Sequence, residues 1–341
     1  MQSHHDLDPA GRFGFRGVAI PPPSLIVWLF LLASVWACQA QPAKPAAKLY
    51  ERVVKTWEDS QPEITLLLRR PVGHTAETPT ASGVLAFCTW EKEDASLRKR
   101  LLNDNDPLVS YARRKNLAVL TWNTATLWKT GKSFDQINRA ERRSQDAAFD
   151  AVARAWERGV KEICAEQGLP QTGFLLYGIS RGAHWSGRLA LRAPERFLAV
   201  ALHVANSYEK PTGSAAGPLW LVSSGDLDIG RNNAMAFYRL CQSKGMPIIF
   251  KVANGLGHAS SPEIERLRDG FFDYALEVRQ RSADKEAPAS VMLSDLRQGG
   301  LTGDLLTQEV YRGAGAAVVP VAQRVPLPDE TLAKVWGFLR K

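Results

Sequence analysis

Cysteine is scarce in this sequence, and its spacing excludes the common structural metal sites. The chain has four cysteines among its 341 residues, namely Cys38, Cys88, Cys164 and Cys241. None of them stands in a Cys-x-x-Cys pair or beside a cluster of histidines, which structural zinc sites require. We therefore expect no bound metal. If Cys38 is removed or lipidated, three thiols remain, so at most one disulfide can form, and the spacing does not say which.

Long apolar runs are also lacking, apart from one near the amino terminus. Residues 25–37, LIVWLFLLASVWA, form a run of 13 apolar and small residues, whereas a helix that spans a bilayer needs about 20. Arg12 and Arg16 precede this run, and a short apolar run behind basic residues is typical of a signal peptide. Residues 1–40 are therefore predicted to direct export, which makes the mature protein secreted or periplasmic.

Two processing sites compete within this amino-terminal segment. Cleavage after Ala40 would put Cys38 and Ala40 at the small-residue positions of a signal-peptide site. Alternatively, the sequence VWAC at 35–38 resembles a bacterial lipobox, in which case Cys38 would carry a lipid. The second alternative predicts a lipoprotein that contacts the membrane only through the lipid on Cys38.

The sequence also lacks a strong concentration of one charge. Lys and Arg number 43 against 35 Asp and Glu, for a net charge of +8, and the basic residues are scattered apart from clusters at 98–100 and 113–115. Short clusters of this kind are typical of a solvated helix face, and no nucleic-acid-binding motif accompanies them. We therefore expect no nucleic acid partner. The 45% of apolar residues is enough to form a folded core.

After a linker at 41–61, residues 62–280 alternate between short apolar runs and amphipathic stretches. Several runs are almost continuously apolar, as strands covered on both faces must be. The expected strands are Ile64–Leu68, Gly83–Phe87, Leu117–Trp122, Phe174–Tyr177, Phe197–His203, Leu219–Ser223 and Ile248–Val252.

Helix signals lie between these runs. Asp106 followed by Pro107 is typical of a helix start. From Arg139 to Glu166, apolar residues recur at steps of three and four, which predicts a long amphipathic helix. Further helices are expected at 182–192, 231–244 and 262–280. Strands that alternate with helices at this spacing indicate an α/β protein whose mostly parallel sheet is covered by helices on both faces.

The sequence GISRG, from Gly178 to Gly182, carries the clearest chemical signal. It follows the apolar run at 172–177 and precedes the helical stretch at 183–192. The chain must turn sharply at such a strand-to-helix junction, and glycines on both sides relieve the crowding so that the serine stands exposed above the sheet. Ser180 is therefore a candidate nucleophile.

A serine nucleophile needs a base, and the base needs an acid that orients it. His258 lies in a loop at 254–262, between an apolar run and an expected helix, and two glycines allow this loop to project the histidine over the sheet edge. The acid is expected after the preceding strand, where Asp226 and Asp228 compete. The carboxylate that is not used by the base would cap the helix that begins near residue 231.

These residues resemble the α/β-hydrolase superfamily, whose acid commonly ends a Gly-x-x-Asp turn. Gly225 to Asp228 matches that turn, so the resemblance favours Asp228 and leaves Asp226 as the alternative. The chain order Ser180, Asp228, His258 is also that of the superfamily.

The resemblance extends over residues 62 to 280 and implies both a fold and a reaction. The implied fold is an eight-stranded, mostly parallel sheet with helices on both faces and no large lid. The implied reaction is carboxylic ester hydrolysis through a covalent acyl-enzyme, which requires no cofactor.

The resemblance further implies an oxyanion hole made of two backbone N–H groups. The first is the N–H of Arg181, directly after the nucleophile. The second follows the strand at 83–90, which gives the N–H of Thr89 or of Trp90. The HGGG-type loop of many lipases is absent from this chain.

A short connection between nucleophile and acid predicts an open site. The loop at 206–218 is too short for a helical lid, which favours bulky, extended or polymeric esters as substrates. Candidates for an aromatic platform at the rim are Trp90, Trp122, Trp128 and Trp185. Exported proteins of this kind resemble dienelactone hydrolases, feruloyl esterases and polyhydroxyalkanoate depolymerases.

Two other functions are open on the sequence alone. A serine peptidase of the prolyl-oligopeptidase type has the same strand-to-helix turn around its serine and the same Ser, Asp, His order along the chain. Such enzymes, however, usually carry a large amino-terminal propeller, for which this chain has no room. The other alternative is a non-catalytic binding protein on a hydrolase scaffold, which would not need all three of Ser180, Asp228 and His258.

Residues 281–341 form a carboxy-terminal extension beyond the last expected helix of the hydrolase-like region. They contain an extended stretch rich in Gly, Ala, Val and Pro, and a short helix is expected near Asp329–Leu339. The sequence does not assign this extension a role.

Overall fold

The structure is a computed structural model of the chain. It describes residues 47–55, 63–71, 81–89, 94–123, 139–212, 217–282 and 291–340. Residues Ala46–Lys341 form one compact unit. The expected signal segment with Cys38 lies outside the described residues, as do Trp90 and Trp128. Within the described part of the chain, no helix is long and apolar enough to cross a bilayer.

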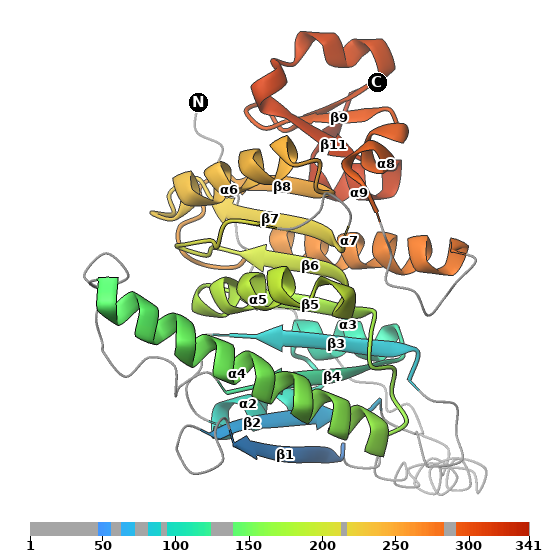
Figure 1. Ribbon diagram of the computed structural model, residues 1–341. Coiled ribbons are helices and arrows are strands. Elements are labelled where there is room, and N and C mark those ends of the chain that lie inside the picture. The colour runs from blue at the N-terminus through green and yellow to red at the C-terminus, as the bar shows by residue number, and fades with distance from the viewer. Residues whose placement is uncertain are drawn as a thin grey trace, which may run out of the picture. The chain divides into compact units, whose positions relative to one another are not determined.

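Eight strands of the described residues form the main sheet, in the order β1-β2-β4-β3-β5-β6-β7-β8 (Figure 1). Their bounds are β1 (Leu49–Lys55), β2 (Glu63–Arg69), β3 (Gly83–Cys88), β4 (Leu117–Trp122), β5 (Phe174–Ile179), β6 (Phe197–His203), β7 (Leu219–Gly225) and β8 (Ile248–Ala253). The pairs β1–β2 and β2–β4 are antiparallel, and the remaining pairs are parallel. The mostly parallel, eight-stranded sheet is therefore confirmed, and the chain has the α/β-hydrolase fold.

Helices cover both faces of this sheet. They are α2 (Asp94–Leu102), α3 (Pro107–Arg114), α4 (Arg139–Glu166), α5 (Arg181–Arg192), α6 (Arg231–Ser243) and α7 (Pro262–Arg281). In Figure 1, α4, α5 and α6 lie on the near face, whereas α2, α3 and α7 lie behind the strands. A right-handed crossover places its helix on one face or the other according to the direction in which the chain steps along the sheet. The step from β3 to β4 runs opposite to those from β4 to β5, β5 to β6 and β7 to β8, so α2 and α3 lie on the other face from α4, α5 and α6.

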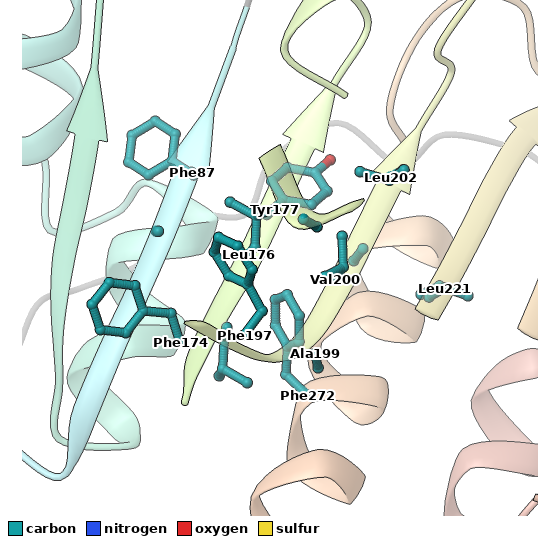
Figure 2. Close-up of a cluster of buried hydrophobic side chains, with 14 of the residues drawn as sticks. Phe87, Phe174, Leu176, Tyr177, Phe197, Ala199, Val200, Leu202, Leu221 and Phe272 are labelled. Carbon is teal, nitrogen blue, oxygen red and sulfur yellow. The ribbon is translucent and has the colours of Figure 1, made fainter. Parts of the chain in front are cut away.

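The core lies between the sheet and these two helix layers. Every residue of β3, β4, β6 and β7 is buried, which explains their continuous apolar runs. Phe174 and Phe197 meet edge-on with ring centroids 6.5 Å apart, and Figure 2 shows them with Leu176 and with Phe272 of α7, which belong to the same buried core. Burying such aromatic side chains contributes about 1.5–3 kcal/mol each, so this cluster fixes the central strands that carry the site.

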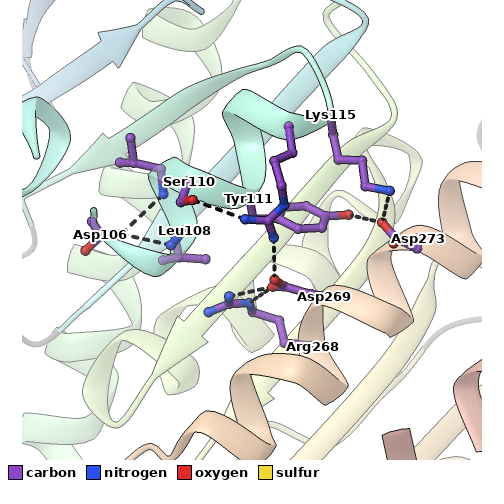
Figure 3. Close-up of polar contacts among 10 residues, drawn as sticks. Asp106, Leu108, Ser110, Tyr111, Lys115, Arg268, Asp269 and Asp273 are labelled. Atoms are coloured by element: carbon purple, nitrogen blue, oxygen red, sulfur yellow. Dashed lines mark hydrogen bonds and ion pairs between the residues drawn. The ribbon is translucent and has the colours of Figure 1, made fainter. Parts of the chain in front are cut away.

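Polar contacts join α3 to α7 behind the sheet (Figure 3). The Tyr111 hydroxyl donates to Asp273 at 2.9 Å, and the Lys115 ammonium lies 2.8 Å from the same carboxylate. Arg114 pairs with Asp269 at 3.2 Å. These contacts anchor the helix that follows the candidate histidine loop.

The structure corrects the expected linker at 41–61, because it contains β1. Three of the seven residues of the strand LYERVVK are charged, since β1 is at the sheet edge and pairs only with β2. Its Val54 is 8% exposed and lies opposite Ile64. Gly159 of α4 packs so closely that an added Cβ would lie 2.7 Å from a Val54 methyl group. The strand is therefore part of the folded domain.

Residues 291–340 form a small carboxy-terminal module against the β8 edge of the main sheet. Within them lie α8 (Leu293–Gln298), β9 (Leu301–Asp304), β10 (Glu309–Arg312), β11 (Arg324–Leu327), α9 (Glu330–Trp336) and β12 (Phe338–Leu339). The strands order as β11-β9-β10-β12, and α9 corresponds to the expected terminal helix. Trp336 is fully buried, and its indole N–H donates to the Phe250 carbonyl of β8 at 2.8 Å. The extension is thus packed onto the main sheet.

Candidate active site

Ser180 occupies a sharp turn between β5 and α5. Its backbone φ of 55° and ψ of −124° lie in a region that side chains rarely adopt, at a cost of about 1–3 kcal/mol. The turn is possible because Gly178 has no Cβ, which would lie 2.5 Å from the Ala183 Cα. The Ser180 N–H donates to the His203 carbonyl at 2.9 Å and ties the turn to β6. The serine is therefore held at the carboxyl edge of the parallel strands.

His258 reaches Ser180 from the loop between β8 and α7. The Ser180 Oγ lies 2.7 Å from the His258 Nε2, and the His258 Nδ1 lies 3.0 Å from the Asp228 Oδ1. A carboxylate can only accept, so Nδ1 carries the proton and Nε2 accepts from the serine hydroxyl. The histidine side chain is 39% exposed, whereas that of Asp228 is fully buried. The structure brings these three residues together in one hydrogen-bonded chain.

The two candidate acids make different contacts. The remaining Asp228 oxygen accepts from the Ser224 hydroxyl at 3.1 Å, and Gly230 N–H donates to Oδ1 at 3.2 Å. Asp226 does not meet the histidine ring in this geometry. Its Oδ1 instead accepts from the Leu256 N–H at 3.2 Å, inside the loop that carries His258. Asp226 therefore braces the loop rather than capping α6.

The acid turn and the histidine loop approach each other closely at Gly225. A Cβ added there would lie 2.7 Å from the Gly257 carbonyl oxygen and would also collide with Leu256. Any larger residue at 225 would push the loop away. The glycine of the Gly-x-x-Asp turn is thus required by backbone contact between the two loops.

His203, at the end of β6, lies beneath the same loop. Its Nε2 lies 2.8 Å from the Ala259 carbonyl, and its Nδ1 lies 2.9 Å from the Ser223 hydroxyl. The carbonyl can only accept, so Nε2 carries the proton and Nδ1 accepts from the serine. Burial lowers the pKa of His203 from its ordinary 6.5 to about 4, so the ring is neutral. Sequence reasoning missed this contact, because a histidine within an apolar strand carries no signal of what lies above it.

The expected oxyanion donors lie where the turn that carries Ser180 meets the end of β3. Arg181 is the first residue of α5, directly after the nucleophile. A Cβ added at Gly182 would lie 2.7 Å from the Thr89 backbone nitrogen and would collide with the Cys88 carbonyl. The Thr89 backbone therefore lies against the turn that carries Ser180. Trp90, the alternative donor, lies outside the described residues.

The expected aromatic platform is not at the rim. Trp122 and Trp185 are 4% and 5% exposed. Trp122 packs edge-on against Trp156 with ring centroids 5.5 Å apart, and Trp185 stacks on Phe149 at 4.5 Å. Both rings belong to the layer between the sheet and α4, so the sequence-based expectation for Trp122 and Trp185 is corrected. Trp128 and Trp90 lie outside the described residues.

A groove of about 630 Å³ opens beside the acid, between the segment after β6 and α6. It is lined by Asn206, Ser207, Tyr208, Glu209, Lys210, Ile229, Gly230, Asn233, Ala236, Phe237 and Leu240. Tyr208 and Phe237 stack with centroids 4.7 Å apart. The side chains on either side of Asp228 are apolar and exposed, Leu227 at 70% and Ile229 at 87%. Sequence reasoning did not find this groove, because its walls come from separate elements.

The three described cysteines form no disulfide with one another, and the backbone of Cys88 lies against Gly182 next to the site. Cys88, Cys164 and Cys241 are buried free thiols. Burial raises the pKa of Cys164 and of Cys241 to about 12, which keeps both thiols protonated and unreactive. Across the described ranges, no group of three His, Cys, Asp or Glu side chains converges as a metal site would require.

Comparison with known proteins finds likeness in structure but not in sequence. No protein-family model matches the chain, and no curated protein matches it. An esterase from the fungus Rhizomucor miehei is 14% identical with a TM-score of 0.48, over 75% of this chain and 90% of that one. Brefeldin A esterase, a bacterial homologue of human hormone-sensitive lipase, is 16% identical with a TM-score of 0.44, over 76% and 85%. A thermostable esterase from Pseudomonas putida is 14% identical with a TM-score of 0.46, over 70% and 86%. At these identities and TM-scores, the likeness bears on neither substrate nor site residues.

Proposed function

We propose that this chain, with its α/β-hydrolase fold, is a serine hydrolase that cleaves carboxylic esters. One observation carries the proposal: the hydroxyl of a strained, half-buried serine hydrogen-bonds to a histidine that is in turn oriented by a buried carboxylate. The two links measure 2.7 Å from the Ser180 Oγ to the His258 Nε2 and 3.0 Å from the His258 Nδ1 to the Asp228 Oδ1. This arrangement activates a serine for acyl transfer.

In the proposed reaction, the Ser180 Oγ attacks the ester carbonyl while the His258 Nε2 takes the hydroxyl proton. The tetrahedral intermediate collapses when Nε2 returns that proton to the leaving alkoxide, which departs as the alcohol. Water then attacks the acyl-enzyme with His258 again as the base, and the carboxylic acid leaves. Asp228 holds the ring and stabilises its cation in both halves.

The negative oxygen of each intermediate would be bound by the backbone N–H groups of Arg181 and Thr89, with Trp90 as the alternative to Thr89. The close approach of Gly182 to the β3 end supports this pairing, because it brings the two backbone segments together. A donor of this kind is worth about 3 kcal/mol of barrier lowering. Asp226 is assigned a bracing role through its contact with Leu256.

The groove supports an ester with a bulky apolar part as the substrate. Its volume of about 630 Å³ suits a group the size of an aromatic or medium-chain moiety. Ile229 and Phe237 supply apolar walls, and Gly230 contacts the catalytic carboxylate directly. A polymeric substrate belongs to the same proposal, since the exposed side chain of Ile229 places the groove at the molecular surface.

Ile229 gives the substrate proposal a direct test. Ile229→Asp should lower kcat/KM for a hexanoate or benzoate ester by about tenfold, since its apolar contact is lost, while acetate ester hydrolysis changes little. Val321→Asp is the matched control, because Val321 is 77% exposed in the carboxy-terminal module. Equal losses for acetate and hexanoate esters in Ile229→Asp would contradict the groove assignment.

Export is a further part of the proposal. Residues 1–40 would direct the chain out of the cytoplasm, with cleavage after Ala40 or lipidation of Cys38 as the two alternatives. Mass spectrometry of the mature amino terminus from the membrane and soluble fractions separates them. A diacylglyceryl group on Cys38 supports the lipoprotein, and an intact amino terminus in both fractions contradicts export.

Fluorophosphonate labelling tests the proposed chemistry. Wild-type protein should label at Ser180 and hydrolyse chromogenic esters, whereas Ser180→Ala should do neither while remaining folded by circular dichroism. Absence of labelling in folded wild-type protein would overturn the hydrolase proposal and favour a binding role on this scaffold. Labelling without ester turnover, but with peptide turnover, would favour the peptidase alternative.

A further inference from the structure

A lysine is buried on β8, the last strand before the His258 loop. Lys251 is 1% exposed, and its ammonium meets three acceptors. Glu263 lies 2.9 Å away, the Trp336 carbonyl accepts at 2.6 Å, and the Gln308 side-chain oxygen is the third acceptor. An ammonium has three N–H donors, so its donors match the three acceptors in number. Burying an ammonium without such partners would cost several kcal/mol, so this set of contacts is mutually dependent.

The partners of Lys251 lie on both sides of the histidine loop. Lys251 precedes the loop on β8, and Glu263 follows it in the first turn of α7. The ion pair therefore closes the base of the segment that carries His258. Between these two points lies the loop that carries His258, which is exposed. A contact across the base sets the positions at which the loop leaves and rejoins the fold.

The other two partners come from the carboxy-terminal module. The Gln308 amide nitrogen also donates to the Val252 carbonyl and lies 3.5 Å from the Asn254 side-chain oxygen. The Trp336 indole donates to the Phe250 carbonyl at 2.8 Å. The module therefore contacts three consecutive residues of β8, from Phe250 to Val252, directly before the loop begins.

Gln308 adopts an uncommon backbone conformation in this position. Its φ is 62°, in the left-handed region that glycine adopts more readily. Its N–H donates to the Asp304 carbonyl at 2.8 Å, which stabilises the tight turn between β9 and β10. This turn points the side chain at β8, where it contacts Lys251 and Val252.

We infer that the carboxy-terminal module is a positioning element of the active site. Gln308 and Trp336 hold the Lys251–Glu263 pair, and this clamp fixes the loop so that His258 meets Ser180. The inference rests on the proposed function only for its effect on turnover. Lys251, Glu263 and Gln308 are positioning residues, because none of them contacts the Ser180–His258–Asp228 chain.

The clamp complements two braces inside the loop. Asp226 holds Leu256, and His203 holds Ala259. These contacts fix the middle of the loop, while Lys251 and Glu263 fix its ends. A displacement of about 1 Å at a catalytic group lowers the rate by about a hundredfold, so partial loosening of the ends should be visible in kcat.

Glu263→Ala tests the clamp from its exposed side, because the Glu263 side chain is 46% exposed and water can take the place of its carboxylate beside the Lys251 ammonium. We expect kcat to fall by about tenfold with KM unchanged, and amide exchange in 254–261 to accelerate by about tenfold. Glu265→Ala is the matched control, since Glu265 lies in the same first turn of α7 and does not pair with Lys251. Both variants remove one negative charge from the helix start.

Gln308→Ala tests the clamp from the carboxy-terminal module. It should reproduce the exchange and kcat effects of Glu263→Ala, although residue 308 lies outside the loop. Its control is Tyr238→Phe, which removes the hydroxyl that donates to the Arg324 carbonyl of β11 and accepts from the Gln242 amide but keeps the ring that stacks on Phe250 of β8. A fall in kcat shared equally by Tyr238→Phe would indicate a general stability effect and overturn the inference.

Hydrogen exchange separates the clamp from the proposed chemistry. Unchanged exchange of the loop in both Glu263→Ala and Gln308→Ala overturns the clamp, whatever the activity. Faster exchange with a lower rate of Ser180 labelling supports it. If wild-type protein neither labels nor turns over esters while both variants show faster loop exchange, the hydrolase proposal fails and the clamp on the loop stands.

Discussion

Asp226 and Asp228 stand two residues apart in one turn, yet their side chains have different partners. Asp228→Asn should lower kcat by about ten-thousandfold, because an amide no longer holds the histidine tautomer that accepts the serine proton. Asp226→Asn should lower kcat far less and reduce the free energy of unfolding by about 1 kcal/mol, since one hydrogen bond to Leu256 is weakened. Steady-state ester hydrolysis and urea denaturation measure both. A larger kcat loss in Asp226→Asn would reverse the assignment.

His203 should make stability depend on pH. Its folded pKa of about 4 lies below its ordinary 6.5 because of burial. The unfolded chain therefore binds the proton first as the pH falls, and stability decreases from about pH 6.5 down to about pH 4, by on the order of 3 kcal/mol, and levels off below. His184 shifts in the same direction, also to about 4, so the variant His203→Gln isolates one contribution.

Urea denaturation of both proteins between pH 8 and pH 4 measures this effect. The glutamine keeps a donor for the Ala259 carbonyl but does not titrate, so its stability should fall less steeply in that window. Parallel stability curves for the two proteins would show that His203 is not held neutral in the fold.

At the residue scale, the sequence predicted the residues whose types carry chemistry and missed those that support them. Ser180, His258 and Asp228 meet in space as their order suggested. Lys251 and Gln308 gave no signal, because a lysine in a strand usually points to solvent. The prediction that Trp122 and Trp185 lie at the rim is wrong, since an aromatic residue at the end of a strand or the start of a helix can face either the core or the solvent.

At the scale of elements, the geometry of the turn at Ser180 depends on how closely α5 approaches β3. Gly182→Ala should lower kcat by about a hundredfold or more, because the new methyl group would displace the Thr89 backbone that we propose as an oxyanion donor. Gly187→Ala in the same helix is the control, as its Cβ would meet only a Leu202 methyl group at 3.1 Å. Burst kinetics with a chromogenic ester check the rate of acylation. Equal rates in the two variants would remove Thr89 from the proposed site.

Elements buried on both faces were predictable, whereas edge elements were not. The seven expected strands are all present in the main sheet, because continuous apolar runs survive only where helices cover both sides. The sequence predicts a linker where β1 lies, since the outer edge of this strand faces solvent and three of its seven residues are charged. The strands of the carboxy-terminal module have four residues or fewer, too short for an alternating pattern to stand out.

At the scale of the whole molecule, the carboxy-terminal module protects the β8 edge of the main sheet. An uncovered edge strand is a template for pairing with other chains. Trp336→Ala should lower the free energy of unfolding by about 3–5 kcal/mol, because a fully buried indole is lost. Phe338→Ala, which truncates a side chain that is 75% exposed, should change it by less than about 0.5 kcal/mol.

Urea denaturation followed by tryptophan fluorescence and light scattering measures this difference. Trp336→Ala should also aggregate at lower urea concentrations than wild type, since loosening the module exposes β8. Equal stability of the two variants would mean that the module does not share the cooperative unfolding of the main sheet.

The backbone strain at Ser180 has an evolutionary consequence. A positive φ with this ψ favours glycine, so the serine keeps the fold less stable than a glycine at the same position would. A lineage that no longer needed the hydroxyl would gain stability by replacing Ser180 with glycine, and the gain in stability would favour that change. A serine that is retained despite this loss of stability indicates selection for its chemistry. Among descendants of this chain, the residue at 180 would therefore report which ones have kept that chemistry.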